Sequence, residues 1–263
     1  METIKHILFG SKILFFSNNF NLLSETILSF LCLIFPFKYP FQVSSFLHKN
    51  NYRIIESISP FIIGIHEEYN ENFFEKNDIS LEGMNVFVVD LGKREEENYH
   101  LFTDEEFPDF PNKLLSNLEK EIKSLDSNTN NNNNINDIIN KDKVIRDYNE
   151  QYQEKFFHFF CEILKGYEEY LNLDFFKSSG DSDSVTSIET LFKCEQFIKH
   201  SNLSQSDIPF YTKFINDSQL FADFIYKRMI PRNNNELMDI LIVNDYLASI
   251  KKKNKKRKRR RTK

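Results

Sequence analysis

The side chains in this sequence best suited to chemistry are His66, Glu67 and Glu68, which follow one another after an apolar run. An imidazole beside carboxylates can bind zinc or transfer protons. However, adjacent side chains at the end of a strand point in different directions, and no second histidine stands at a ligand spacing. We therefore do not expect a metal centre or an acid–base pair at this position.

Two further groups allow both a chemical and a structural interpretation. His158 and Cys161 are three residues apart and share one face of an expected helix, but they stand within an aromatic stripe typical of a core. Asp90 ends an apolar run, where open α/β sheets often place functional groups. It can equally cap the turn that follows. Neither group by itself indicates a catalytic site.

The nucleotide-binding and hydrolase motifs are missing from this sequence. Its six glycines never form G-x-G-x-x-G or G-x-x-x-x-G-K-S/T, which excludes the usual phosphate-cradling loops. A Gly-x-Ser-x-Gly nucleophile elbow is also missing. We expect no catalytic residue, no cofactor and no metal.

Composition and charge limit the classes of partner. With 263 residues and 40% hydrophobic content, the chain can bury the core of one large domain or two small ones. Three widely spaced cysteines indicate buried thiols in a reducing cytosol. Residues 251–263 hold 11 basic residues and no acidic ones, which leaves 23 basic against 39 acidic residues, a net charge of -16, on the rest. We expect no nucleic-acid binding by that acidic body.

The basic run 251–263 has three interpretations: a nuclear import signal, a contact for an anionic membrane surface, or a solvated disordered end. We expect a cytoplasmic protein that can be peripheral at membranes, with nuclear import as the alternative. The apolar run from Ile27 to Phe35 is shorter than a bilayer span, so we expect it to be a buried helix.

The elements of residues 1–103 must position these side chains. Short apolar runs without alternation, separated by helical patterns, predict an α/β fold with an open, mostly parallel sheet flanked by helices. A helix from about Phe20 to Phe35 and a shorter crossover from about Lys49 to Ser57 join the first strands. The expected strands lie near Lys12–Ser17, Phe41–Ser45, Phe61–His66 and Val86–Leu91.

The remaining residues predict a helical C-terminal region. We expect a helix and an Asn-rich disordered loop over 104–142, a helical module over 143–230 that begins with one long helix from 143 to 176, and a second loop near 177–184. Ser218 can cap a new helix whose aromatic side chains pack inward. A terminal helix over 231–250 and a basic disordered tail over 251–263 complete the prediction.

Three runs in the first part resemble the central module of a DENN domain in their order and spacing. They are Pro36-Phe-Lys-Tyr-Pro-Phe-Gln-Val, Ser59-Pro-Phe-Ile-Ile-Gly-Ile-His and Val86-Phe-Val-Val-Asp-Leu-Gly. A later run that starts at Pro209 and includes Ser-Gln-Leu-Phe-Ala-Asp-Phe-Ile is similar to the last module of that family.

The resemblance implies a guanine-nucleotide exchange factor that binds a Rab GTPase and promotes GDP release. Within the matched motifs, the strand-end residues Tyr39, Pro40, His66 and Asp90 are the expected partner-binding residues. The family's upstream longin-like lobe is not recognised before the first strand. A truncated gene model, a degenerate relative and a separate longin-like lobe as a further partner are all consistent with this. The alternative is a DENN-like interaction scaffold, or a truncated relative of the family, without exchange activity.

Overall fold

The computed structural model describes residues 1–93, 99–102, 105–131, 141–172, 188–200 and 203–261. The chain forms two compact units. The first consists of Met1–Cys32, Tyr39–Asp109 and Asp217–Leu220, and the second of Leu33–Lys38, Phe110–Asn216 and Phe221–Lys263.

A five-stranded sheet in the order β2-β3-β1-β4-β5 forms the centre of the first unit. The central strand β1 (Lys12–Phe16) is parallel to β3 (Phe61–Ile65) on one side and to β4 (Val86–Asp90) on the other. The outer strand β2 (Gln42–Ser44) is parallel to β3. The predicted open, mostly parallel sheet is therefore confirmed.

The fifth strand, β5 (Tyr99–Phe102), was not predicted. It pairs antiparallel with β4 at the edge of the sheet. Its four side chains alternate between exposed and partly buried, so it lacks the continuous apolar run that marks the inner strands. A short half-exposed edge strand leaves little pattern in a sequence.

Helices cover both faces of the sheet, which explains why the inner strands are apolar without alternation. Phe16 of β1 meets Phe73 of the short helix α3 (Phe73–Lys76), with ring centroids 4.9 Å apart. The 3-10 helix η1 (Lys49–Glu56) packs on this same face through Tyr52 and Ile55.

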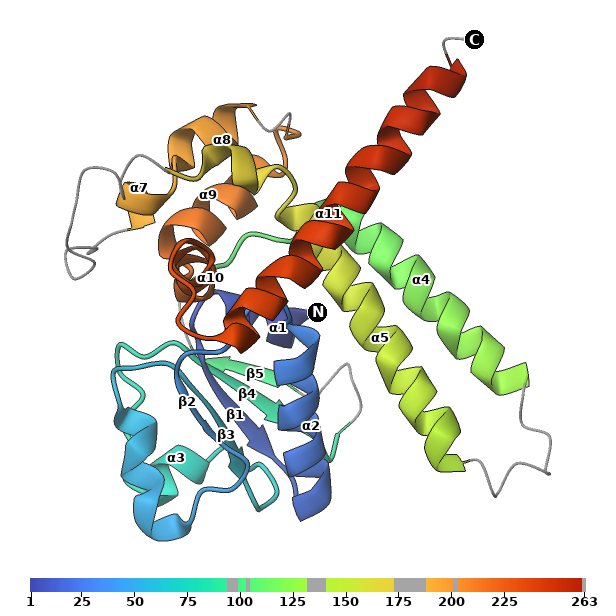
Figure 1. Ribbon diagram of the computed structural model, residues 1–263. Coiled ribbons are helices and arrows are strands. Elements are labelled where there is room, and N and C mark those ends of the chain that lie inside the picture. The colour runs from blue at the N-terminus through green and yellow to red at the C-terminus, as the bar shows by residue number, and fades with distance from the viewer. Residues whose placement is uncertain (94–98, 103–104, 132–140, 173–187, 201–202, 262–263) are drawn as a thin grey trace. The chain divides into compact units, whose positions relative to one another are not determined.

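The opposite face lies against α1 (Glu2–Leu8) and α2 (Phe20–Leu33). Phe15 of β1 stacks on Phe30 of α2 at 5.5 Å, and Phe87 of β4 stacks on His6 of α1 at 4.1 Å. Figure 1 shows α2 and α3 on opposite sides of the sheet. The predicted helix between the first two strands is confirmed and ends two residues earlier than expected.

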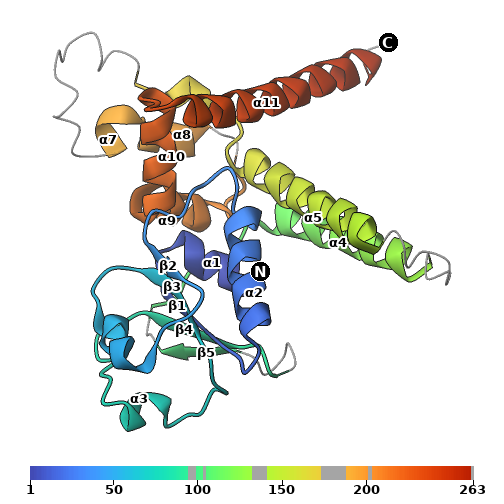
Figure 2. The same ribbon diagram turned by 60° about the horizontal axis from the view of Figure 1, so that its bottom comes forward.

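The second unit is helical, as predicted. Its helices α4 (Asn112–Asn131) and α5 (Lys141–Ile163) run side by side in both views (Figures 1 and 2). The described helices are α4 (Asn112–Asn131), α5 (Lys141–Ile163), η4 (Tyr167–Tyr170), α7 (Ile188–Leu191), α8 (Cys194–His200), α9 (Ile208–Asp217), α10 (Gln219–Met229) and α11 (Asn234–Arg261).

The prediction of a single long helix over 143–176 is wrong about where the helix ends. The helix α5 ends at Ile163, and Gly166 adopts a left-handed conformation with φ +84° before η4 begins. A left-handed glycine shortly after the last turn is a common helix terminator, because glycine carries no Cβ penalty there. The aromatic stripe continues past this point, which is why periodicity alone missed the break.

Aromatic side chains fill the core of the second unit. The ring of Phe37 lies 5.3 Å from Phe160, 5.6 Å from Phe214 and 5.5 Å from Phe224. Phe221 and Ile225 of α10 are also buried, so the prediction that its aromatic face packs inward is confirmed. Ser218, the predicted cap, directly precedes α10, and its hydroxyl donates to the Leu8 carbonyl at 2.7 Å within the first unit.

Two segments differ from the expected disorder. The helix α4 extends to Asn131 and includes the first asparagines of the tract, because each added residue continues an existing hydrogen-bond ladder. The helix α11 continues to Arg261 instead of ending at residue 250. Lysine and arginine are good helix formers and are favourable at a helix C-terminus. The predicted loop near 177–184 and the tract residues 132–140 lie outside the described residues.

None of the helices in the described part of the chain is both long enough and apolar enough to cross a bilayer.

Candidate functional site at the carboxyl edge of the sheet

The connections that leave β1 and β3 run to opposite faces of the sheet. The chain goes from β1 into α2 on one face, and from β3 into α3 on the other. Since β1 and β3 are neighbours, their carboxyl ends form a point at which the connections diverge. Open α/β sheets bind ligands at such points. The carboxyl edge of β1 and β3 is therefore the candidate position of a functional surface.

Three rings from three different connections meet at this edge. Phe20 begins α2, Phe46 follows β2, and His66 follows β3. The ring centroid of Phe20 lies 5.3 Å from Phe46 and 5.7 Å from His66, and Phe46 lies 6.4 Å from His66. Phe20 is 47% exposed and Phe46 is 40% exposed. We call Phe20, Phe46 and His66 the edge cluster, an aromatic surface open to solvent.

Hydrogen bonds hold the edge cluster in place. The Nε2 of His66 lies 2.9 Å from the Asn18 carbonyl, and because a carbonyl only accepts, Nε2 carries the proton. The Asn18 side chain donates to Glu68 at 2.7 Å. Asn19 accepts from the backbone N–H of Leu22 at 3.1 Å, which satisfies a free donor at the start of α2. The edge cluster is therefore preorganised and has a polar, acidic rim.

Asp90, one of the predicted contact residues, lies at the carboxyl end of β4 but points inward. It is 4% exposed, and its Oδ1 accepts from the backbone N–H of Gly92 at 2.9 Å. The Lys93 ammonium lies 3.9 Å from its other oxygen. These contacts support the turn-capping alternative for Asp90.

Tyr39 and Pro40 lie away from the edge cluster. Both precede β2, so they stand at the amino end of a strand that is parallel to β3, whereas His66 follows the carboxyl end of β3. The Tyr39 hydroxyl is buried and has no hydrogen-bond partner among the described residues, and burial raises its pKa. The four predicted contact residues thus do not form one surface in the structure.

Replacing Tyr39 by phenylalanine is expected to leave the free energy of unfolding unchanged or to raise it by up to about 1 kcal/mol, because the lost hydroxyl is buried and unpaired. Urea unfolding measures this. The matched control is Tyr52→Phe, whose hydroxyl donates to Glu67 at 3.3 Å, and which is expected to lose about 0.5 kcal/mol. If Tyr39→Phe lowers the free energy of unfolding as much as Tyr52→Phe does, the Tyr39 hydroxyl is not unpaired.

Sequence reasoning missed Phe20, Phe46 and Asn18. Phe46 stands in a different segment from Asn18 and Phe20, and no spacing in the sequence predicts that the two segments meet. A weak signal exists for Phe20, because Asn18 and Asn19 precede it and asparagine is favoured where a helix begins.

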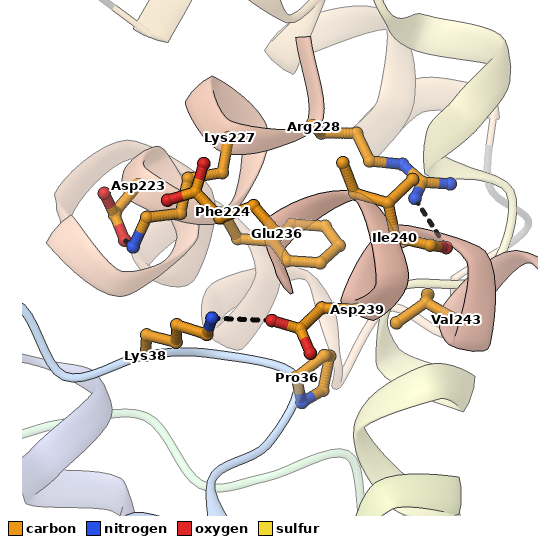
Figure 3. Close-up of a pocket in the computed structure, with 10 residues that line it drawn as sticks. All are labelled: Pro36, Lys38, Asp223, Phe224, Lys227, Arg228, Glu236, Asp239, Ile240 and Val243. Carbon is orange, nitrogen blue, oxygen red and sulfur yellow. Dashed lines mark hydrogen bonds and ion pairs between the residues drawn. The ribbon is translucent and has the colours of Figure 1, made fainter. Parts of the chain in front are cut away.

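The second unit contains a pocket between α10 and α11 that is too small for a ligand. About 30 Å³ is open to a water-sized molecule. Figure 3 shows that Lys38 pairs with Asp239, at 2.6 Å, and that Arg228 donates to the Ile240 carbonyl at 2.9 Å. The Arg228 guanidinium also lies 5.3 Å from the ring centroid of Tyr167. The bond from Arg228 to Ile240 joins α10 to α11, and the other two contacts join these helices to Lys38 and η4, so we interpret the pocket as structural.

The histidine and cysteine of α5 do not form a metal site. Cys161 is fully buried, and burial raises the pKa of its thiol to about 12. His158 stacks on Tyr246 with ring centroids 4.3 Å apart. In the part of the chain that the structure describes, no three His, Cys, Asp or Glu side chains gather in a metal-binding arrangement.

Comparison with known proteins places the edge cluster in a recognised segment. The family model of the DENN (AEX-3) domain matches residues 1–94. The DENN assignment is confirmed for these residues. All three members of the edge cluster lie within this DENN segment, 1–94, and so do the four contact residues expected from the sequence.

The chain is also similar to one much longer protein. Myotubularin-related protein 5 of Caenorhabditis elegans is 23% identical over 241 residues, which cover 91% of this chain. The chain spans 13% of the length of that relative. The similarity extends beyond the DENN segment into the helical second unit.

Proposed function

We propose that this protein binds a Rab family small GTPase through the edge cluster and promotes the release of GDP. The observation that carries this proposal is the match of residues 1–94 to the DENN domain, with an exposed aromatic surface inside that segment. The position of the edge cluster, where the connections from β1 and β3 diverge, supports it further. The four residues expected from the family motifs include one member of this surface, His66.

Exchange of this kind needs no catalytic acid, base or nucleophile. A factor that binds the nucleotide-free GTPase more tightly than the GDP-bound form lowers the affinity for GDP by the same ratio. The required property is a preorganised surface, because binding free energy spent on ordering flexible groups is lost. The hydrogen bonds of Asn18 to His66 and Glu68 supply such order. Exposed aromatic residues at the centre of an interface commonly contribute most of its affinity.

The second candidate function is a scaffold that binds a GTPase without accelerating exchange. The extent of the family match favours this second function, because the match covers residues 1–94 and does not include the helical second unit. Both candidates use the same edge cluster, and they differ in whether bound nucleotide is released.

The decisive experiment measures release of a fluorescent GDP analogue from a panel of Rab GTPases, with and without this chain. Faster release from one or two members is expected. Binding to a nucleotide-free GTPase without faster release would select the scaffold. A folded sample that neither binds any member nor accelerates release contradicts both candidates.

Substitution of Phe46 by serine is expected to lower the exchange rate about tenfold, because it removes one of the exposed rings of the edge cluster. The control is Leu28→Ser, which removes a 59% exposed apolar side chain from the middle of α2. Its exchange rate is expected to match that of the unsubstituted protein. Equal losses in the two variants would place the GTPase surface elsewhere.

A further inference from the structure

The first half of α11 is apolar on two opposite faces. Val243, Leu247 and Ile250 are 1%, 3% and 9% exposed and pack into the second unit. With 100° between successive helical residues, the opposite face holds a second apolar group. This group is the α11 stripe, and its members are 45 to 56% exposed: Leu237, Met238, Leu241 and Ile242.

Contacts on the buried face prevent α11 from rotating to cover the stripe. Tyr246 of α11 lies 5.3 Å from Phe157 and stacks on His158 of α5. Arg228 of α10 donates to the Ile240 carbonyl and also bonds to Asn244. The α11 stripe therefore stays exposed while the helix keeps these partners.

The same helix continues into the most basic part of the chain. Residues 251–263 hold 11 Lys and Arg and no acidic residue, and α11 extends through Arg261. At 1.5 Å per residue, the middle of residues 251–261 lies about 25 Å along the helix axis from the middle of the stripe. An apolar surface and a strong positive charge thus lie on one helix.

The combination of these two surfaces distinguishes between possible occupants. A nucleic acid or an import receptor recognises the basic run, but neither needs an apolar stripe. A membrane surface uses both, since apolar side chains enter the boundary of the acyl chains and Lys and Arg contact anionic headgroups. The charge of -16 on the other residues makes the basic run the part best suited to an anionic surface.

We propose that α11 lies along the surface of a membrane that contains anionic lipid. The α11 stripe enters the headgroup boundary, and residues 251–261 contact the headgroups. Asp245, which is exposed one turn after Leu241, marks the end of the inserted part. The proposal does not depend on the proposed GTPase function, because neither surface involves the edge cluster.

The test is flotation of the purified full chain with vesicles of phosphatidylcholine, either alone or with added phosphatidylserine, at physiological salt. Binding is expected only when phosphatidylserine is present. Replacing Leu237 and Leu241 together by serine is expected to lower the ratio of bound to free protein roughly tenfold. Replacing Lys252 and Lys253 together by glutamine is expected to lower it by at least about fivefold.

The matched control is Ile58→Ser, which removes a 97% exposed apolar side chain from the first unit and is expected to leave vesicle binding unchanged. Circular dichroism checks that all variants remain folded. If the variant without Leu237 and Leu241 still binds vesicles as well as the unsubstituted protein, the proposal is overturned, because charge alone then accounts for binding. It is also overturned if no vesicle is bound, if both vesicles are bound equally, or if the stripe proves to be the contact of a dimer.

Discussion

Replacing Gly64 by alanine is expected to lower the free energy of unfolding by about 3 kcal/mol, because a Cβ at this position has no room. It would lie 3.0 Å from the carbonyl carbon of Ser45 and still closer to its oxygen. The Ile27 side chain lies 3.4 Å away on the same side. The Ser45 backbone cannot simply move, since Leu47 donates to the Gly64 carbonyl at 2.9 Å and is itself buried.

Thermal and urea unfolding measure this loss, which corresponds to a fall in melting temperature of roughly 6–12 °C. Gly92→Ala is the matched control, because the nearest neighbour of a Cβ there is a side-chain oxygen of Asp90 at 3.2 Å and not a backbone atom. If the Gly64 variant is as stable as the Gly92 variant, a Cβ at Gly64 does not clash with the Ser45 backbone.

The same substitution is expected to impair the proposed exchange activity. Gly64 lies two residues before His66, and Ser45 lies one residue before Phe46, so a shift between these backbones displaces two members of the edge cluster. The glycine of the motif Pro-Phe-Ile-Ile-Gly-Ile-His thus has a structural reason, the close approach of the segment after β2.

Acidification from about pH 6.5 to about pH 4 is expected to remove up to about 3 kcal/mol of stability through His6 alone. Burial, with the neighbouring charge of Lys5, lowers the pKa of His6 from 6.5 to about 4. Between these two values the unfolded chain binds a proton that the folded chain does not, so stability falls as the pH falls. Above pH 6.5 the residue is neutral in both states and contributes no pH dependence.

The surroundings of His6 make its protonation costly. Its ring stacks on Phe87 at 4.1 Å, meets Phe107 edge-on at 5.1 Å, and has its Nδ1 2.8 Å from the Ser11 hydroxyl. The carboxylate of Glu105 favours the charged form and offsets part of the cost.

The measurement is the urea midpoint as a function of pH for the unsubstituted protein and for His6→Gln, which cannot titrate. Carboxylates titrate in the same window in both proteins, so the difference between the curves isolates His6. A flatter curve for the variant between pH 6.5 and 4 is expected. Parallel curves would show that His6 does not resist protonation.

Much of the first unit could be predicted from the sequence because of how it is buried. Strands covered on both faces appear as apolar runs such as Phe-Ile-Ile-Gly-Ile, and their boundaries were predicted to within a residue. The edge strand β5 lacks that signal because half of its side chains face solvent. The break at Gly166 was missed because a stripe of aromatic residues shows which face is buried but not where backbone hydrogen bonding stops.

The candidate functional surface could be predicted from the sequence only in part. The DENN motifs and the absence of catalytic motifs follow from residue order alone, and they led to His66 and Asp90. Whether such a residue faces a partner depends on the direction of its side chain, and here His66 faces solvent while Asp90 turns inward.

By itself, the sequence determined the α/β sheet, the helical second unit, the family motifs and the opposed charges of the chain, since these depend on local pattern and composition. Only the tertiary structure decided that Phe20, Phe46 and His66 form one surface, and that α11 exposes a second apolar face. The physical reason is that strand order brings together connections far apart in the chain, and that packing against one side of a helix leaves its other side free.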